Sequence, residues 1–198
     1  MNAAEEEVLR ANAYALLAAL LTAPPSADLL QALSVLDGDV DADDGPMGAA
    51  FATLASAARA ALPADVADEY GTLFIGVGGG ELSPYGSYYK TGFLNEKPLA
   101  ELRADMARLG IARADDVREP EDHIAALCEM MAGLITGAFD AEATLDEQRA
   151  FYERHVAGWA ERFFTDLEAA PSARFYRAVG ALGRTFLAVE GQAFDLAA

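Results

Sequence analysis

Cysteine and histidine are scarce in this 198-residue chain, which argues against several kinds of site. Cys128 is the only cysteine, so no internal disulfide can form and a reducing compartment is indicated. Without a second thiol, Cys128 is interpreted as a small buried hydrophobe rather than a nucleophile. His123 and His155 are the only histidines, and no HxxxH or HExxH spacing joins them. This disfavours a metal-dependent hydrolase, and we expect neither metal nor cofactor.

Positive charge is also sparse. The chain has 14 basic residues against 32 acidic ones, which gives a formal net charge of −18. Such a chain repels phosphate backbones, so nucleic acid is disfavoured as a partner. A cationic peptide would be attracted, and its rate of encounter would rise. Solubility alone explains the same charge, and both interpretations stay open.

Hydrophobic runs are short. The apolar stretch Ala11–Ala23 follows Glu5, Glu6 and Glu7, where a secretory signal would carry positive charge. It is also shorter than the roughly 20 residues that span a bilayer. The chain carries no Arg-Arg pair of its own, so it is not expected to be a twin-arginine export substrate. These features predict a cytoplasmic protein without stable membrane insertion.

Helical periodicity dominates what is present. Apolar residues recur at i, i+3 and i+4 from Leu9 to Leu21, and the Ala-Pro-Pro sequence before Ser26 ends that helix. Ser26 can cap a short helix that runs to about Leu36. No alternating pattern of useful length predicts a strand. We therefore expect an all-α fold, a single helical-bundle domain over residues 1–198. Further helices are predicted at about 47–61, 64–75, 97–109, 120–138, 142–169 and 172–190.

Two segments interrupt the helical pattern. Asp37–Gly45 is an acidic surface loop, which lacks the glycine and glutamate spacing of an EF-hand. Gly76–Thr91 is rich in glycine, proline and serine, and we predict a long irregular loop there. Its glycine cluster lacks the last glycine of GxGxxG, because Glu81 stands at that position. A helix precedes the cluster, so helix termination is favoured over dinucleotide binding.

The sequence EPEDHI, residues 119–124, has two interpretations. Pro120 followed by acidic residues is typical of a helix start, because acids favour the positive end of the helix dipole. His123 would then face the apolar side of that helix, and Asp122 would face a side of small residues. One interpretation is a capped helix with a partly buried, hydrogen-bonded histidine. The other is a functional site.

An aromatic stripe at helical spacing follows Phe151. Such a stripe is more often core than ligand box, and we interpret it as core. Its members are Tyr152, His155, Val156, Trp159, Phe163 and Leu167.

Four motifs in this order resemble the TorD/DmsD/NarJ superfamily of redox-enzyme maturation chaperones. Together they cover most of residues 70–168, whereas the first 60 residues contribute little identity. The motifs are YGTLFIG at 70–76, PYGS at 84–87, EPEDH at 119–123 and FYERH at 151–155, followed by Trp159 and Phe163-Phe164.

The resemblance implies a helical chaperone, not an enzyme, that binds the twin-arginine signal peptide of a molybdenum-cofactor oxidoreductase precursor before export. It implies that Tyr85, Ser87, Asp122 and His123 line the peptide-binding region. It also implies that their setting is made by Leu73, Phe74, Pro84, Glu119 and Pro120.

The residues agree with this implication, because an acidic protein with an apolar groove complements a leader with a basic start and an apolar middle. Two other functions stay open: a helical regulatory or structural module without such a client, and a metal-dependent hydrolase that uses Asp122 and His123. No residue pattern supports guanine-nucleotide binding. The sequence leaves open the client enzyme, any help with cofactor insertion, and the choice between monomer and homodimer.

Overall fold

The computed structural model describes residues 2–36, 45–76, 79–113, 117–139 and 142–196. Over these ranges the chain is helical and contains no strand, which confirms the all-α prediction. The chain divides into two compact units, and each is built from two stretches of sequence. That residues 1–198 make a single domain stays a prediction. None of the described helices has the length and hydropathy needed to cross a bilayer.

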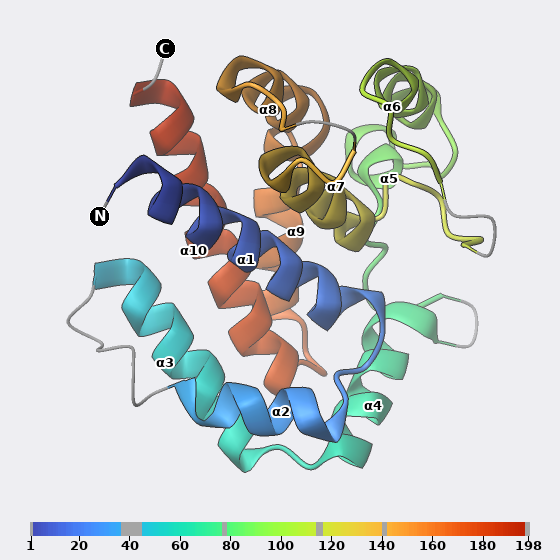
Figure 1. Ribbon diagram of the computed structural model, residues 1–198. Helices are drawn as coiled ribbons and strands as arrows, with labels where there is room; N and C mark the ends of the chain where they lie inside the picture. Colours follow the sequence, from blue (N-terminus) through green and yellow to red (C-terminus); the bar gives the residue numbers. More distant parts are fainter. Residues whose placement is uncertain (1, 37–44, 77–78, 114–116, 140–141, 197–198) are drawn as a thin grey trace. The chain divides into compact units, whose positions relative to one another are not determined.

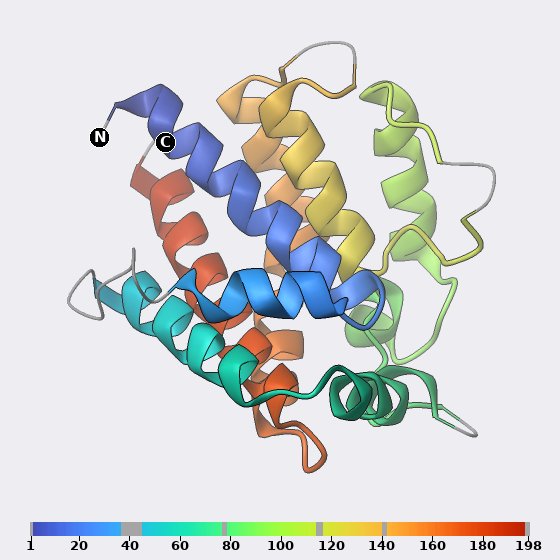
Figure 2. The ribbon, with the colours of Figure 1, turned by 60° about the horizontal axis from the view of Figure 1, so that its bottom comes forward.

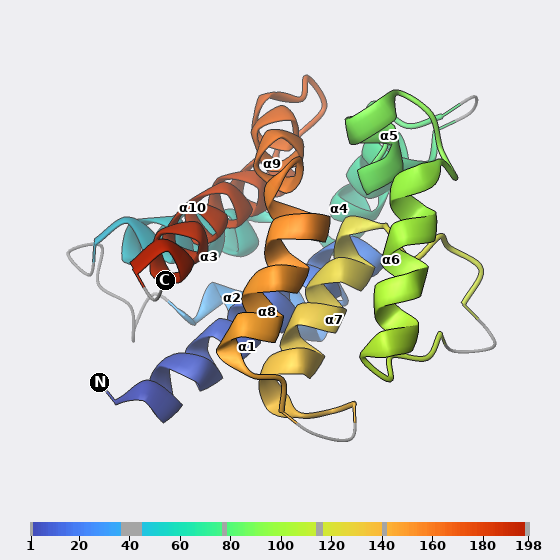
Figure 3. The same cartoon turned by 90° about the horizontal axis from the view of Figure 1, so that it is seen from above.

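The first unit contains the residues up to Thr22 and Pro84–Ala160. The most extensive packing between two of its helices is that of α1 on α7 (Figure 1). In all three ribbon views α7 lies between α1 and α6 (Figures 2 and 3). Its elements are α1 (Ala3–Thr22), α5 (Gly86–Thr91), α6 (Lys97–Arg108), α7 (Ile124–Thr136), α8 (Leu145–Tyr152) and the π-helical turn η3 (Glu153–Ala157).

The second unit contains Ala23–Ser83 and the residues from Glu161 onward. Helix α10 packs on α3 and α4, and α2 covers α3. Its elements are α2 (Ala27–Ser34), α3 (Gly45–Ala60), α4 (Pro63–Tyr70), the π-helical turn η2 (Gly71–Ile75), most of α9 (Ala160–Ala169) and α10 (Phe175–Leu196).

Capping explains several helix starts. The Ser26 side chain accepts a hydrogen bond from the N–H of Leu29, as predicted, and so begins α2. Helix α10 starts against the Glu69 carboxylate, which accepts the N–H groups of Arg174 and Tyr176, both at 2.8 Å. A carboxylate at this end of a helix accepts hydrogen bonds from the free N–H groups, and its negative charge is stabilised by the positive end of the helix dipole.

Four predicted boundaries were wrong. The helix expected from residue 120 begins at Ile124, because the preceding residues form a turn. Gly76–Thr91 is not irregular throughout, since it contains α5. The helix expected over 142–169 is broken at Gly158 and Trp159, after the wide turn of η3. The last helix runs beyond residue 190 to Leu196, and most of the acidic loop lies outside the described residues.

The predicted core is confirmed. Every member of the aromatic stripe from Tyr152 to Leu167 is buried. Cys128 is 2% exposed. Burial raises the pKa of its thiol far above the usual range, which keeps it protonated and unreactive at neutral pH.

Candidate functional site

Two segments that are distant in the sequence, 84–87 and 119–124, lie side by side in the first unit. Tyr85 and His123 form an isolated antiparallel bridge between them, flanked by two backbone hydrogen bonds of 2.9 Å. We call these two segments and their contacts the seam. The seam fixes the start of α5 against the start of α7.

The Asp122 carboxylate is the most buried charge of the seam, with 3% exposed. Its Oδ2 accepts the backbone N–H of Ser87 at 2.6 Å, so it holds the first turn of α5 in place. Its Oδ1 and the Ser87 hydroxyl are both buried, and neither has a hydrogen-bond partner in the described part of the chain. A buried polar atom without a partner is costly, by about 1–3 kcal/mol, so a ligand that donates to Oδ1 or bonds the Ser87 hydroxyl would relieve this cost.

His123 is the N-cap of α7, because its Nδ1 accepts the N–H of Ala125 at 3.1 Å. Burial lowers the pKa of His123 to about 4, although the carboxylates of Glu119 and Asp122 act in the opposite direction. The imidazole is therefore neutral at pH 7, with its remaining proton on Nε2. Its ring meets the ring of Tyr85 edge to face, 5.1 Å between centroids. The expected half-buried, hydrogen-bonded histidine is thus present.

Glu119 and Pro120 complete the seam. The Tyr85 hydroxyl donates to Oε2 of Glu119, whose side chain is exposed. The N–H of His123 donates to the carbonyl of Pro120 at 3.1 Å, which closes the turn before α7. Pro120 was predicted to occupy the first helical position. It instead shapes the turn that precedes α7.

Seven of the nine predicted site residues belong to the seam, and the other two do not. Leu73 and Phe74 lie in the second unit, where Leu73 is fully buried. The Phe74 ring packs edge to face on Tyr70 and Tyr176, with centroids 5.0 and 5.4 Å apart. Both residues are part of the aromatic core of that unit.

An ion-pair cluster beside the seam was missed from the sequence. The Glu121 carboxylate accepts two hydrogen bonds from Arg103, at 3.0 and 2.8 Å, and lies 3.5 Å from Arg113. The pKa of Glu121 is lowered, because the hydrogen bond and charge of Arg103 outweigh burial. Arg103 ties the turn before α7 to α6, and Arg113 ties it to the segment after α6, so Glu121 positions the neighbouring Asp122.

A second missed cluster centres on Asp105 of α6, which is 6% exposed. Its carboxylate accepts from Nε2 of His155 and pairs with Arg154, each at 2.8 Å. Arg108 lies 3.3 Å away. The wide turn η3 presents both His155 and Arg154 to this one carboxylate. No local sequence pattern marks the cluster, because its partners are about fifty residues apart.

Trp159, the one tryptophan of the chain, supports α5 from the other side. A Cβ on Gly86 would lie 3.1 Å from its indole nitrogen, so a larger residue there requires the ring or the helix to shift. The Tyr89 ring lies over the indole, with centroids 5.4 Å apart. Lys90 donates to the carbonyl of Arg154 at 2.7 Å. Helix α5 is therefore held between the seam and the Trp159 ring.

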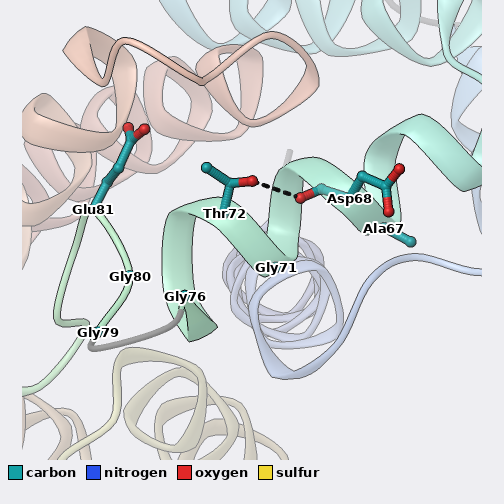
Figure 4. A pocket seen from close by; sticks show the side chains of 8 residues that line it. All are labelled: Ala67, Asp68, Gly71, Thr72, Gly76, Gly79, Gly80 and Glu81. Atoms are coloured by element: carbon teal, nitrogen blue, oxygen red, sulfur yellow. Dashed lines mark hydrogen bonds between the residues drawn. The ribbon is translucent and has the colours of Figure 1, made fainter.

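The glycine cluster surrounds an open hollow of about 680 Å³ in the second unit (Figure 4). Gly76 ends η2 with φ +34°, and a Cβ there would lie 2.4 Å from the carbonyl oxygen of Gly79. Gly76 thus ends a helix, as predicted. Figure 4 shows the Thr72 hydroxyl bonded to the carbonyl of Asp68, at 3.0 Å. The hollow is lined by Ala67, Asp68, Gly71, Thr72, Gly76, Gly79, Gly80 and Glu81.

Among the residues that the structure describes, no group of three or more histidine, cysteine or carboxylate side chains is arranged to hold a metal ion. The two side chains that a hydrolase would use are also engaged: Oδ2 of Asp122 and Nδ1 of His123 each accept a backbone N–H.

The chain is similar to several curated proteins named chaperone protein TorD. That of Aliivibrio fischeri is 30% identical over 141 residues, which cover 67% of this chain and 64% of the relative. That of Photobacterium profundum is 31% identical over 122 residues, which cover 58% and 56%. The matched region thus spans somewhat less than two thirds of these relatives.

A solved structure gives the same fold. The crystal structure described as a redox enzyme maturation protein from Archaeoglobus fulgidus superposes with a TM-score of 0.59, over 90% of this chain and 93% of that one. At 19% identity this likeness concerns the fold. The family model for the nitrate reductase delta subunit matches residues 40–165, more than half of the chain. The chain therefore belongs to the nitrate reductase delta subunit family, within the TorD/DmsD/NarJ superfamily that its four motifs indicate.

Proposed function

We propose that this protein is a cytoplasmic chaperone, not an enzyme, that binds the twin-arginine signal peptide of a molybdoenzyme precursor and assists its maturation before export. Family membership and the name of the TorD relatives support the chaperone role. The net charge of −18 favours a leader with a basic start over any nucleic acid.

The observation that carries the proposal is the unpaired oxygen of Asp122. Oδ1 is a buried carboxylate atom without a donor in the described part of the chain, and the unpartnered Ser87 hydroxyl is also buried. A guanidinium group supplies several N–H donors in a planar fork and suits a carboxylate better than an ammonium does. A leader arginine would therefore gain a charge-assisted bond at Oδ1.

The seam must open for this contact to form, because Asp122 is 3% exposed. The bonds that close it are few: Ser87 to Asp122, Tyr85 to Glu119, and the two backbone bonds of the bridge. An extended leader offers backbone groups that can replace those of the bridge, as in strand addition. Because α7 packs along α1, we expect α5 to be the element that moves.

The test is the affinity of a synthetic leader for the wild type and for Asp122→Asn. Asparagine keeps an oxygen for the N–H of Ser87, so the melting temperature should hardly change. Loss of one charge-assisted bond should weaken leader binding by roughly tenfold to a hundredfold. Tyr85→Ala should also weaken binding, and the double variant should be non-additive, because both residues touch one peptide.

Two results would contradict the proposal. If the folded Asp122→Asn protein bound the leader with wild-type affinity, the seam would have only a structural role. Failure of any basic-then-apolar leader to bind the wild type would favour a helical regulatory module without such a client. We predict that the protein is a monomer or a homodimer, and sedimentation measurements can distinguish the two.

A further inference from the structure

A groove runs between α1 and α7 in the first unit, on helices that lie side by side in Figures 1 and 2. Its volume of about 420 Å³ falls within the range of ligand pockets, roughly 300–1,000 Å³. Small side chains make most of its surface, so a guest backbone can approach closely. The groove is lined by Ala11, Asn12, Ala15, Ala18, Ala19, Glu129, Ala132, Gly133, Thr136, Ala138 and Phe139.

The face of α1 that lines the groove extends beyond it. Asn12, Ala15 and Ala19 follow Val8 at i+4, i+7 and i+11, so they share one helix face. Val8 is a large apolar residue that is 58% exposed. From Val8 to Ala19 the face is about 16 Å long, at about 1.5 Å per residue.

Glu129 is the one charged residue among those that line the groove. Burial raises its pKa, and a hydrogen bond with Thr22 offsets this only in part. Two buried carboxylates of this unit, Glu121 and Asp105, have arginine partners, whereas Glu129 lies at the surface. Within the described ranges Glu129 has no such cation, so the groove combines apolar walls with an uncompensated acid.

We infer that this groove holds the apolar segment of the leader and that a leader arginine pairs with Glu129. The inference rests on the proposed function and assigns a second contact region of the same peptide. An apolar segment of a leader has roughly 7–15 residues, which as a helix spans about 10–22 Å and matches the exposed face of α1.

The seam and the groove can serve one peptide, because both include α7. His123 caps the start of α7, and Glu129 lies six residues further on, about 9 Å along the helix axis. A second copy of this chain is the less fitting occupant, because its net charge of −18 would bring acidic surface to an acidic groove.

The test uses two fluorescein-labelled peptides. One carries an arginine pair before the apolar segment, and the other carries a glutamine pair in its place. Glu129→Gln should weaken binding of the arginine peptide about tenfold and leave the glutamine peptide nearly unaffected. Glu142→Gln is the matched control, since Glu142 is exposed and lies outside the groove.

A second variant tests the apolar walls. Ala15→Leu fills the groove and should weaken both peptides tenfold or more, by removing the space for the guest. Ala15 is exposed on α1 and leucine is a good helix former, so folding should be preserved; Ala19→Leu repeats the test one turn away. Ala112→Leu, at an exposed alanine outside the groove, is the control.

The outcomes separate this inference from the proposed function. If the wild type binds the arginine peptide and both groove variants bind it equally well, the groove assignment is wrong and the proposed function stands. If Ala15→Leu changes the sedimentation coefficient but not the affinity, the groove is a contact between copies and the assignment is wrong. If the wild type binds no arginine peptide, both proposals are wrong.

Discussion

His155 donates a hydrogen bond from Nε2 to Oδ2 of Asp105 across 2.8 Å, and both side chains are buried. The bond joins α6 to the wide turn η3, so it connects two elements that no local pattern relates. Asp105→Ala should lower the free energy of unfolding by about 2–4 kcal/mol, because it leaves the imidazole N–H and the Arg154 charge without their acceptor.

Urea unfolding at pH 7 measures this change. Arg108→Ala is the control within the same cluster: the Arg108 side chain is 58% exposed, and exposed ion pairs contribute about 1 kcal/mol or less. Equal losses in the two variants would contradict the assignment of Asp105 as the centre of the cluster.

Acid should destabilise the protein through His123. Its pKa is about 4 in the folded chain, against an ordinary value of 6.5. The unfolded chain therefore binds more protons between these pH values, and stability is lost as the pH falls from about 6.5 to about 4. His123→Gln should remove roughly 2–3 kcal/mol of this pH dependence. Melting temperatures from pH 7 to pH 4 check it, and parallel profiles for the two proteins would contradict it.

Trp159 should report on the position of α5. Gly86→Ala places a methyl group about 3 Å from the indole nitrogen, so the ring or the helix must shift, at a cost of about 1–3 kcal/mol. The emission of the single tryptophan should change in this variant. Leader binding that opens the seam should change it as well, whereas Gly92→Ala, at the other end of α5, lacks such a close contact and tests backbone strain alone.

Salt should act mainly on leader association. A net charge of −18 would steer a basic leader towards the protein, and screening would weaken that steering. Raising the salt concentration from about 0.01 M to 0.15 M should slow association more than it speeds dissociation. Stopped-flow anisotropy separates the two rates. Equal association rates for leaders with and without the arginine pair at every salt concentration would leave the charge as a solubility feature.

The long helices could be predicted from the sequence because their apolar residues recur at helical spacing, as they do from Leu9 to Leu21. Helix α5 could not, because six residues are too few to show a period. The start of α7 was misplaced because Pro120 and its acids match a helix start. Asp122 instead bonds Ser87, a residue 35 positions away that no local rule relates to it.

The candidate site, like the fold, could be predicted only in part. Motif resemblance brought together the seven seam residues, but it also named Leu73 and Phe74, whose burial in the second unit reflects packing that the motif does not encode. The ion pairs of Glu121 and Asp105 are side-chain contacts across distant segments. Such contacts depend on tertiary packing, which periodicity cannot supply.

The division of the chain also has a consequence for its synthesis. The first unit ends at Ala160, whereas the second unit takes α10 from the 38 residues 161–198. At about 5–20 residues per second, a ribosome needs roughly 2–8 s for that remainder. The unit with the seam and the groove can therefore close while α2, α3 and α4 still await α10. During this interval the nascent chain carries one unit whose residues are all present and one that still lacks its last helix.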